Sequence, residues 1–173
     1  MILLLRAVNV GHGRSVPMAD LRALAAAVGL DSARTYLQSG NLRGESSEAP
    51  EVVADRLEVA LLARFGFAVP VIGRRDDGWQ ETVAACPFPD AAAERANLLH
   101  VALARVAPPA GTADRLAGRC AARERVAVVG DALWIDYADG AGRSKLTPAL
   151  LDRVVGAPVT ARNWRTVTAL LTL

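Results

Sequence analysis

The stretch between residues 2 and 72 decides the fold, because strand-like and helix-like segments alternate in it in a fixed order. It opens with residues 2–8 (ILLLRAV), a short apolar run typical of a buried strand. A helix, two short strands around a turn, a second helix and a last strand follow. These segments are residues 17–28, 33–37, 41–43, 50–65 and 67–72. The order β-α-β-β-α-β is that of a ferredoxin-like lobe.

Proline and glycine mark where the two helices of this stretch begin and end. Pro17 and Pro50 suit the first helical position, and Gly29 and Gly66 follow the last turns. Pro70 lies in the last strand-like run (FAVPVI). Because proline cannot donate a ladder hydrogen bond, we expect that strand at an edge of its sheet.

The second half of the chain repeats the same order of elements. Its strands are expected at residues 97–104, 125–129, 132–137 and 158–161, and its helices at residues 112–119, capped by Thr112, and after Thr147. A linking helix (76–86) precedes the break PFPD at residues 87–90, and a helix capped by Asn163 (164–171) ends the chain. We therefore predict an α+β protein of two tandem ferredoxin-like lobes, residues 1–86 and 90–173.

Composition limits the classes of function. The chain has 173 residues, of which 52% are apolar, and a net charge of +2, so it can bury a core and lacks the strongly basic balance of a duplex-DNA binder. Two cysteines without paired spacing predict neither a disulfide framework nor a zinc site. The opening apolar run is too short for a signal or membrane segment, so we expect a cytoplasmic protein without a membrane partner.

The strongest candidate site is the loop DGAGRSKLTP, residues 139–148. Glycines let backbone N–H groups turn inward, two cations and a hydroxyl follow, and a helix begins at Thr147, all of which favour an anion. Lys145 is the only lysine among 20 basic residues. No Ser or Thr follows it directly, which excludes a P-loop. The predicted anion ligands are Gly142, Arg143, Ser144 and Lys145. The alternative is a tight loop with solvated side chains; Schiff-base chemistry on Lys145 lacks an identified carbonyl substrate.

Two polar segments of the first half are further candidates. Residues 9–14 (NVGHGR) follow the first strand, and residues 34–41 (RTYLQSGN) are dense in hydrogen-bonding side chains. Asn9, Gly11, Gln38, Ser39 and Asn41 are expected to read a ligand if the loops converge. The alternatives are a solvated His12 and a turn whose amides satisfy backbone groups. Ser39 lacks the surroundings of an esterase nucleophile.

A last polar segment is residues 160–166 (TARNWRT). Arg162 and Asn163 either cap the terminal helix or face a ligand, and Trp164 is expected to anchor that helix. Histidine, cysteine and carboxylate spacing predicts no metal, and we expect no cofactor. Aromatic residues are only 5% and the strands expected at residues 2–8 and 97–104 carry none, which disfavours RNA binding by stacking.

Taken together, the segments RAVNVG (6–11), RTYLQSGN (34–41), GRSKLT (142–147) and TARNW (160–164) resemble the signature blocks of the bacterial domain of unknown function 1697. The resemblance runs along essentially the whole chain and implies two ferredoxin-like lobes. It implies no activity, substrate or cofactor.

Three functions remain open at this point. The first is a binding module or enzyme for a small anionic ligand bearing phosphate or carboxylate, and the sequence does not decide between the two. The second is a protein-interaction or scaffold domain whose polar segments brace the lobes. The third, which the charge balance disfavours, is single-stranded nucleic-acid binding through basic loops, with steep salt dependence. The oligomeric state is left open.

Overall fold

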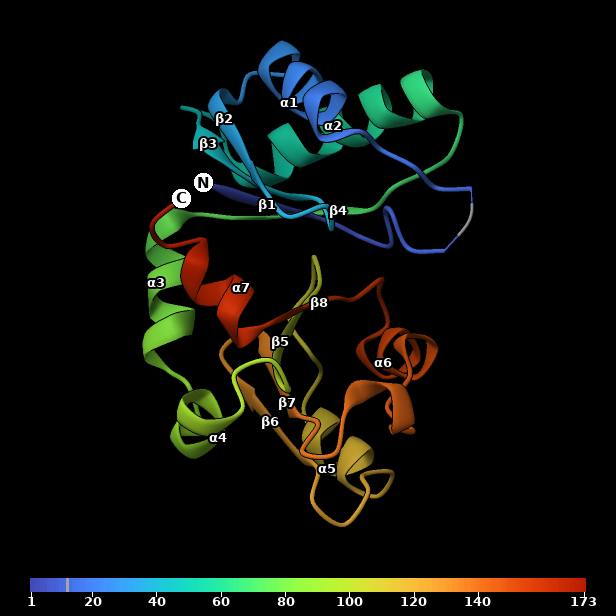
Figure 1. Ribbon diagram of the computed structural model, residues 1–173, viewed down its shortest axis with the longest axis vertical. Coiled ribbons are helices and arrows are strands. Elements are labelled where there is room, and N and C mark those ends of the chain that lie inside the picture. Colours follow the sequence, from blue (N-terminus) through green and yellow to red (C-terminus); the bar gives the residue numbers. More distant parts are fainter. Residues whose placement is uncertain (12) are drawn as a thin grey trace. The chain divides into compact units, whose positions relative to one another are not determined.

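A computed structural model describes residues 1–11 and 13–173 of the chain (Figure 1). It divides into two compact units, Met1–Trp79 together with Leu170–Leu173, and Gln80–Ala169. The division falls ahead of the PFPD break at which the sequence places the lobe boundary, and the last four residues belong with the first unit.

The first unit has the ferredoxin-like order predicted for it. Its strands are β1 (Ile2–Leu5), β2 (Asp31–Tyr36), β3 (Asn41–Glu45) and β4 (Val71–Arg74), and its helices are α1 (Met18–Ala27) and α2 (Pro50–Phe65). The strands form an antiparallel sheet in the order β2-β3-β1-β4. Pro70 comes directly before β4, an edge strand, where no ladder donor is needed. Gly66 ends α2 in the left-handed conformation (φ 76°), as the sequence indicates.

The core of the first unit lies between its sheet and its two helices, which cover one face of the sheet in Figure 1. Alternate residues of β1, Leu3 and Leu5, pack with Leu21 of α1 and Leu57 of α2. All of β1 is buried, including Ile2 and Leu4 on the other face, which explains the unbroken apolar run.

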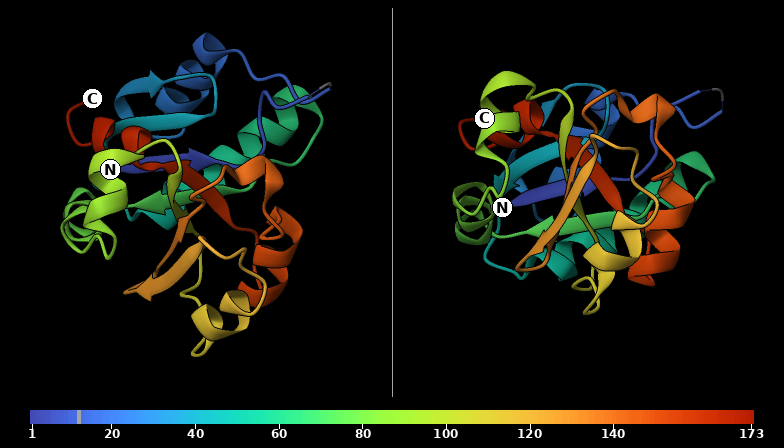
Figure 2. Two further views of the ribbon diagram at one scale, coloured as in Figure 1. Left: turned by 60° about the horizontal axis from the view of Figure 1, so that its bottom comes forward. Right: turned by 90° about the horizontal axis from the view of Figure 1, so that it is seen from below.

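The second unit repeats the arrangement. Its sheet is β5 (Leu99–Leu103), β6 (Arg125–Val129), β7 (Ala132–Asp136) and β8 (Thr160–Asn163), in the order β6-β7-β5-β8. Helices α5 (Thr112–Ala117) and α6 (Pro148–Val155), yellow and orange in Figure 2, pack Leu116 and Leu151 against Leu133 and Ile135 of β7. The prediction of two ferredoxin-like lobes is therefore confirmed.

Three further helices complete the described residues. They are α3 (Asp76–Ala84), which contains the division between the units, α4 (Pro89–Glu94) and α7 (Trp164–Ala169). A short 3-10 turn, η1, spans Ala141–Arg143. Asn163 caps α7 as predicted, since its Oδ1 accepts the Thr166 N–H at 2.9 Å. Trp164 rests on buried Trp134, with ring centroids 5.5 Å apart, which supports its anchoring role.

Some local predictions were wrong. The break at residues 87–90 contains the start of α4, because Pro89 suits a first helical turn as well as it suits a break. Thr112 does not cap α5; Gly111 precedes the helix, and the buried Thr112 hydroxyl instead accepts from Arg115 at 3.2 Å. The last strand begins at Thr160, two residues later than expected, because Asp152 at the end of α6 accepts the Val159 N–H at 2.8 Å.

Within the part of the chain that the structure describes, no helix is long and apolar enough to cross a membrane.

Candidate functional site

Lys145 lies at the edge of a pocket beside the first turn of α6. The pocket has a volume of about 250 Å³ and belongs wholly to the second unit. Its lining residues are Arg119, Lys145, Thr147, Ala149, Leu150 and Arg153. Arg119 follows α5, Lys145 comes two residues before the cap of α6, and Arg153 is in the second turn of that helix. We call this the basic pocket.

The charges of the basic pocket are all of one sign. Arg119, Lys145 and Arg153 are exposed, and within the described residues none of their side chains has a hydrogen-bond or ion-pair partner. The lining contains no carboxylate. A concave surface lined by one sign of charge raises the local concentration of the opposite ion. The arrangement therefore favours an anion over any other small ligand.

The start of α6 adds partial positive charge. Thr147 caps the helix by accepting the Leu150 N–H at 3.3 Å, and Pro148 occupies the first helical position, both as predicted. Ala149 is in the first turn, where backbone N–H groups have no acceptor within the helix. The positive end of the helix macrodipole thus lies at the wall of the basic pocket.

The glycine-rich loop before Lys145 holds its own shape. Gly140 has a φ of 102°, which favours glycine, and the chain then makes the η1 turn. The Ser144 hydroxyl accepts the Leu146 N–H at 3.0 Å, so it braces the loop. Gly142 and Arg143 are exposed and lie outside the pocket lining. Of the four residues predicted in this loop, Lys145 alone lines the pocket.

In the first unit, the two polar segments do come together. Asn9 Nδ2 donates to the carbonyl oxygens of Val16 (3.0 Å) and Gln38 (2.7 Å), and Asn9 Oδ1 accepts the Val16 N–H at 2.8 Å. Asn9 itself has a φ of 55°, a conformation that asparagine tolerates well. Both polar atoms of the Asn9 side chain are therefore hydrogen-bonded to the backbone of the two loops, and they hold these loops together.

The turn after β2 is built in the same way. Asn41 Nδ2 donates to the Tyr36 carbonyl at 2.7 Å and to the Ser39 hydroxyl at 3.0 Å. Gly40 is required there: its φ is 73°, and a Cβ would come within 2.6 Å of the Leu5 Cβ. We call Asn9, Gln38, Ser39 and Asn41 the amide brace. The Gln38 side chain is exposed, Gly11 has a φ of 68°, and His12 lies outside the described residues.

Arg162 lies in β8 and is buried. Its guanidinium donates to the Thr160 hydroxyl at 2.8 Å and to the Ala161 carbonyl at 3.0 Å. Burial lowers the pKa of Arg162 to about 10, so the side chain remains charged at neutral pH. The predicted residues thus fall into two groups, the amide brace with Gly11 in the first unit and Gly142–Lys145 with Arg162 and Asn163 in the second.

A buried carboxylate in the second unit was missed by the sequence analysis. The Asp136 side chain is fully buried at the end of β7, and its two oxygens accept from Arg95 (2.8 and 3.1 Å) and Arg125 (2.8 and 3.1 Å). Asp90 of α4 bridges the same two arginines at 3.0 and 2.7 Å. We call these four residues the Asp136 cluster. The signal available was an aspartate inside the apolar run ALWIDY, but its partners are 41 and 11 positions away.

With this geometry in place, the comparison with protein families is decisive. The model described as "Protein of unknown function (DUF1697)" matches residues 1–134. The chain belongs to the DUF1697 family. This agrees with the resemblance in the sequence, although the matched residues end ahead of the Lys145 loop. No curated protein matches the chain.

The fold of this DUF1697 chain is similar to a solved structure, that of the conserved bacterial protein SP0830 from Streptococcus pneumoniae. The TM-score is 0.71 at 18% sequence identity, and the match covers 98% of this chain and 94% of that one. At this identity the likeness shows a common fold and leaves the chemistry of the basic pocket to its own residues.

In its second unit, the DUF1697 chain buries one titratable group, Tyr137, and partly buries two others, His100 and Cys120, and all three are uncharged at neutral pH. Desolvation lowers the pKa of His100 and raises that of Cys120, and burial, helped by the Glu124 and Cys120 charges, raises the pKa of Tyr137 to about 12. The His100 and Tyr137 rings meet edge to face, 5.0 Å apart. All three groups are therefore neutral at pH 7. The described residues contain no group of three or more potential metal ligands.

Proposed function

We propose that the second unit of this DUF1697 chain binds a small anionic ligand, bearing phosphate or carboxylate, in the basic pocket. The observation that carries the proposal is the gathering of Arg119, Lys145 and Arg153 around one pocket whose lining holds no carboxylate. Three like charges repel one another, and folding gains nothing from bringing them together. An anion would relieve that repulsion and accept their hydrogen bonds.

Each charge-assisted hydrogen bond contributes about 1.5–3 kcal/mol. Loss of one such bond therefore weakens binding by roughly tenfold or more. Lys145 would act as a compact cation with three donors, whereas the two arginines would offer planar forks that suit phosphate and carboxylate oxygens. The Ala149 N–H would complete the site, since Pro148 has no N–H and Leu150 donates its own to Thr147.

The test is isothermal titration calorimetry with inorganic phosphate, followed by a thermal-shift screen of phosphosugars, nucleotides and dicarboxylates. A ligand at a hundred times its dissociation constant raises stability by about 2.7 kcal/mol. We expect K145A, R119A and R153A to weaken binding by about tenfold or more each, and K145R to weaken it less.

Arg143→Ala is the matched control, because Arg143 is an exposed cation two positions from Lys145 that lies outside the pocket lining. Equal losses in R143A and K145A would reveal non-specific attraction to positive charge and contradict a built site. If neither phosphate nor any compound of the screen binds, the proposal fails and the interaction-domain alternative is favoured.

A further inference from the structure

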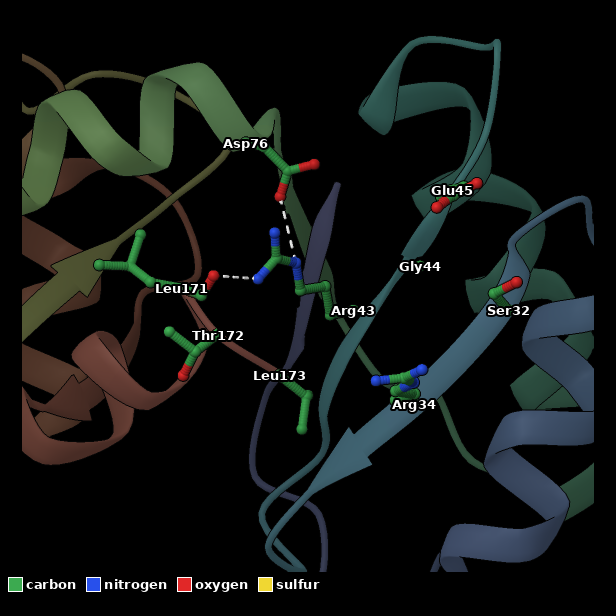
Figure 3. A pocket seen from close by; sticks show the side chains of 9 residues that line it. All are labelled: Ser32, Arg34, Arg43, Gly44, Glu45, Asp76, Leu171, Thr172 and Leu173. Atoms are coloured by element: carbon green, nitrogen blue, oxygen red, sulfur yellow. Dashed lines mark hydrogen bonds and ion pairs between the residues drawn. The ribbon is translucent and has the colours of Figure 1, made fainter.

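A second polar cavity lies on the first unit, on the face of its sheet opposite to α1 and α2. It has a volume of about 390 Å³ and is formed by β2, β3, the first residue of α3 and the last three residues of the chain (Figure 3). Its lining residues are Ser32, Arg34, Arg43, Gly44, Glu45, Asp76, Leu171, Thr172 and Leu173. Every one of them belongs to the first unit. We call it the sheet cavity.

One arginine of the sheet cavity, Arg43, is paired with groups of its own unit. The Arg43 guanidinium donates to the Leu170 carbonyl at 2.9 Å and also to that of Leu171, and its Nε lies 3.4 Å from Asp76 Oδ1. The other oxygen of Asp76 accepts from the Met1 nitrogen at 2.8 Å. Figure 3 shows Arg43 between Asp76 and the last residues of the chain. Asp76 is therefore shared by the Arg43 guanidinium and the Met1 ammonium, and these three groups hold the wall of the cavity in place.

The other two charged side chains have no such partners. Arg34 faces Arg43 directly across the β2–β3 ladder, and two like charges in that position destabilise a sheet. Glu45 is two residues beyond Arg43 on β3, so it lies on the same face. Arg34 and Glu45 are both exposed, and among residues 1–11 and 13–173 neither side chain has a hydrogen-bond or ion-pair partner. In Figure 3 they line the cavity without pointing at each other.

The backbone beside these charges departs from a regular strand. The β2–β3 register shifts between Asp31 and Arg34, and Ser32 has a φ of 52°. A residue other than glycine is strained in this conformation, and such strain is concentrated at functional sites. The irregularity places the Ser32 hydroxyl in the lining together with Arg34.

We propose that the sheet cavity binds a free α-amino acid as its zwitterion. Apart from the group formed by Arg43, Asp76 and the Met1 ammonium, the lining carries two charged side chains that have no partner among the described residues, the cation Arg34 and the anion Glu45. A ligand with a carboxylate for the Arg34 fork and an ammonium for Glu45 matches both. The Ser32 hydroxyl adds hydrogen-bonding capacity, and Leu173 offers an apolar wall for the ligand side chain. The volume falls at the small end of the range of natural ligand pockets.

The test compares three forms of each common L-α-amino acid by ligand-observed NMR and calorimetry on the intact chain. The amino acid carries both charges, its amide lacks the carboxylate, and its N-acetyl form lacks the ammonium. We expect at least one amino acid to bind, and both modified forms to bind it about tenfold more weakly or worse. We expect R34A to abolish discrimination against the amide, and E45Q to abolish discrimination against the N-acetyl form.

Two controls separate this site from other sources of binding. Arg64→Ala removes an exposed arginine on α2, outside the lining, and K145A removes one of the three cations of the basic pocket; both should bind the amino acid like the wild type. Conversely, R34A should leave phosphate binding at the basic pocket unchanged, so the two proposals fail independently.

Several results would overturn the assignment. These are the absence of binding by every amino acid, wild-type affinity for the amino acid in R34A, or an amide that binds as well as its parent. Acetate serves as a probe that carries a carboxylate and no ammonium. If R34A loses binding of both acetate and the amino acid while E45Q changes neither, the cavity is a simple anion site and the proposal of a zwitterion fails. A dipeptide that binds more tightly than either of its residues would replace the free amino acid with a peptide.

Discussion

Two groups of charges in the second unit differ in whether they are paired. In the Asp136 cluster, two aspartates and two arginines satisfy one another, and the central carboxylate is fully buried. In the basic pocket, three cations stand together at the surface without a carboxylate among the lining residues. The ion pairs of the cluster stabilise the fold, and this role is enough to explain why the four charges lie together. The gathering in the pocket has no such explanation, which is why it is the better candidate for a ligand.

The amide brace in the first unit shows that neutral polar groups can likewise be satisfied within the fold and leave nothing for a ligand. Its segments are rich in polar side chains, yet Asn9 donates to the Val16 and Gln38 carbonyls, and Asn41 donates to the Tyr36 carbonyl and the Ser39 hydroxyl. Density of polar side chains alone is therefore a weak guide to a binding site. Whether the groups are already satisfied is the stronger one.

The largest expected effect comes from breaking the Asp136 cluster. Asp136→Ala removes the buried acceptor of Arg95 and Arg125, which stay partly exposed and keep Asp90, so we expect a loss of about 2–3 kcal/mol from the lost charge-assisted hydrogen bonds. Urea unfolding at neutral pH measures the loss. Asp114→Ala, which removes an exposed aspartate of α5, should cost less than about 0.5 kcal/mol. A cost for D136A no greater than that of D114A would remove the contrast between paired and unpaired charges.

The next effect concerns the amide brace. Asn9→Ala removes three hydrogen bonds and places alanine at a φ of 55°, so we expect a loss of about 1–3 kcal/mol in the free energy of unfolding. Gln38→Ala is the control, because only the carbonyl of Gln38 takes part and alanine keeps it. Similar midpoints for N9A and Q38A would show that the brace is dispensable.

A smaller effect is the loss of stability in acid, which we expect from the Asp136 cluster and not from the basic pocket, because only the cluster contains carboxylates. The Arg125 and Arg95 hydrogen bonds lower the pKa of Asp90 to about 2. Burial by itself would raise the pKa of Asp136, but the same two arginines outweigh it and hold that pKa below the usual value. The unfolded chain therefore takes up protons first, and stability that is complete above about pH 4 declines as the pH falls toward 2.

Asp90→Asn tests this dependence. It removes one of the two titrating carboxylates, so urea midpoints measured on either side of the aspartate range should differ less in D90N than in the wild type. The difference is modest because Asp90 is about half exposed and water screens its ion pairs. A steeper acid dependence in D90N than in the wild type would contradict the pairing described here.

The smallest effect is expected in the basic pocket without ligand. Substituting Arg119, Lys145 or Arg153 by alanine should change the free energy of unfolding by less than about 0.5 kcal/mol, and at low salt the change should be stabilising, since repulsion is then least screened. Thermal unfolding at low and high salt measures both. A clear destabilisation at low salt would show that these cations stabilise the fold and would weaken the case for a ligand.

Much of the fold follows from local signals in the sequence. Pro50 and Gly66 bound α2, and Thr147, Pro148 and Gly156 bound α6, because prolines suit first turns and glycine adopts the left-handed cap. Element order then predicts both sheets. The error at α4 arises because Pro89 can end one segment and begin another, and the error at β8 arises because the Val159 N–H donates to Asp152.

The candidate sites were less accessible from the sequence, because they depend on which elements meet. Lys145 and Thr147 are recognisable within one loop, but Arg119 comes from the end of α5, and nothing in its local sequence sets it apart from the other arginines. Likewise Arg34 and Arg43 become neighbours only through the register of β2 on β3. Partners far apart in the chain, such as Arg95 and Asp136, carry no periodic signal at all.

The assignment of Leu170–Leu173 to the first unit has a consequence for biosynthesis. The ribosome must produce all of Gln80–Ala169 before it can supply the segment whose carbonyl oxygens receive the Arg43 guanidinium. Domains generally fold in order of synthesis, N-terminal first. Here the first unit waits for Leu170–Leu173, which are made after Gln80–Ala169, so the wall of the sheet cavity stays incomplete in the nascent chain until the second unit has been synthesised.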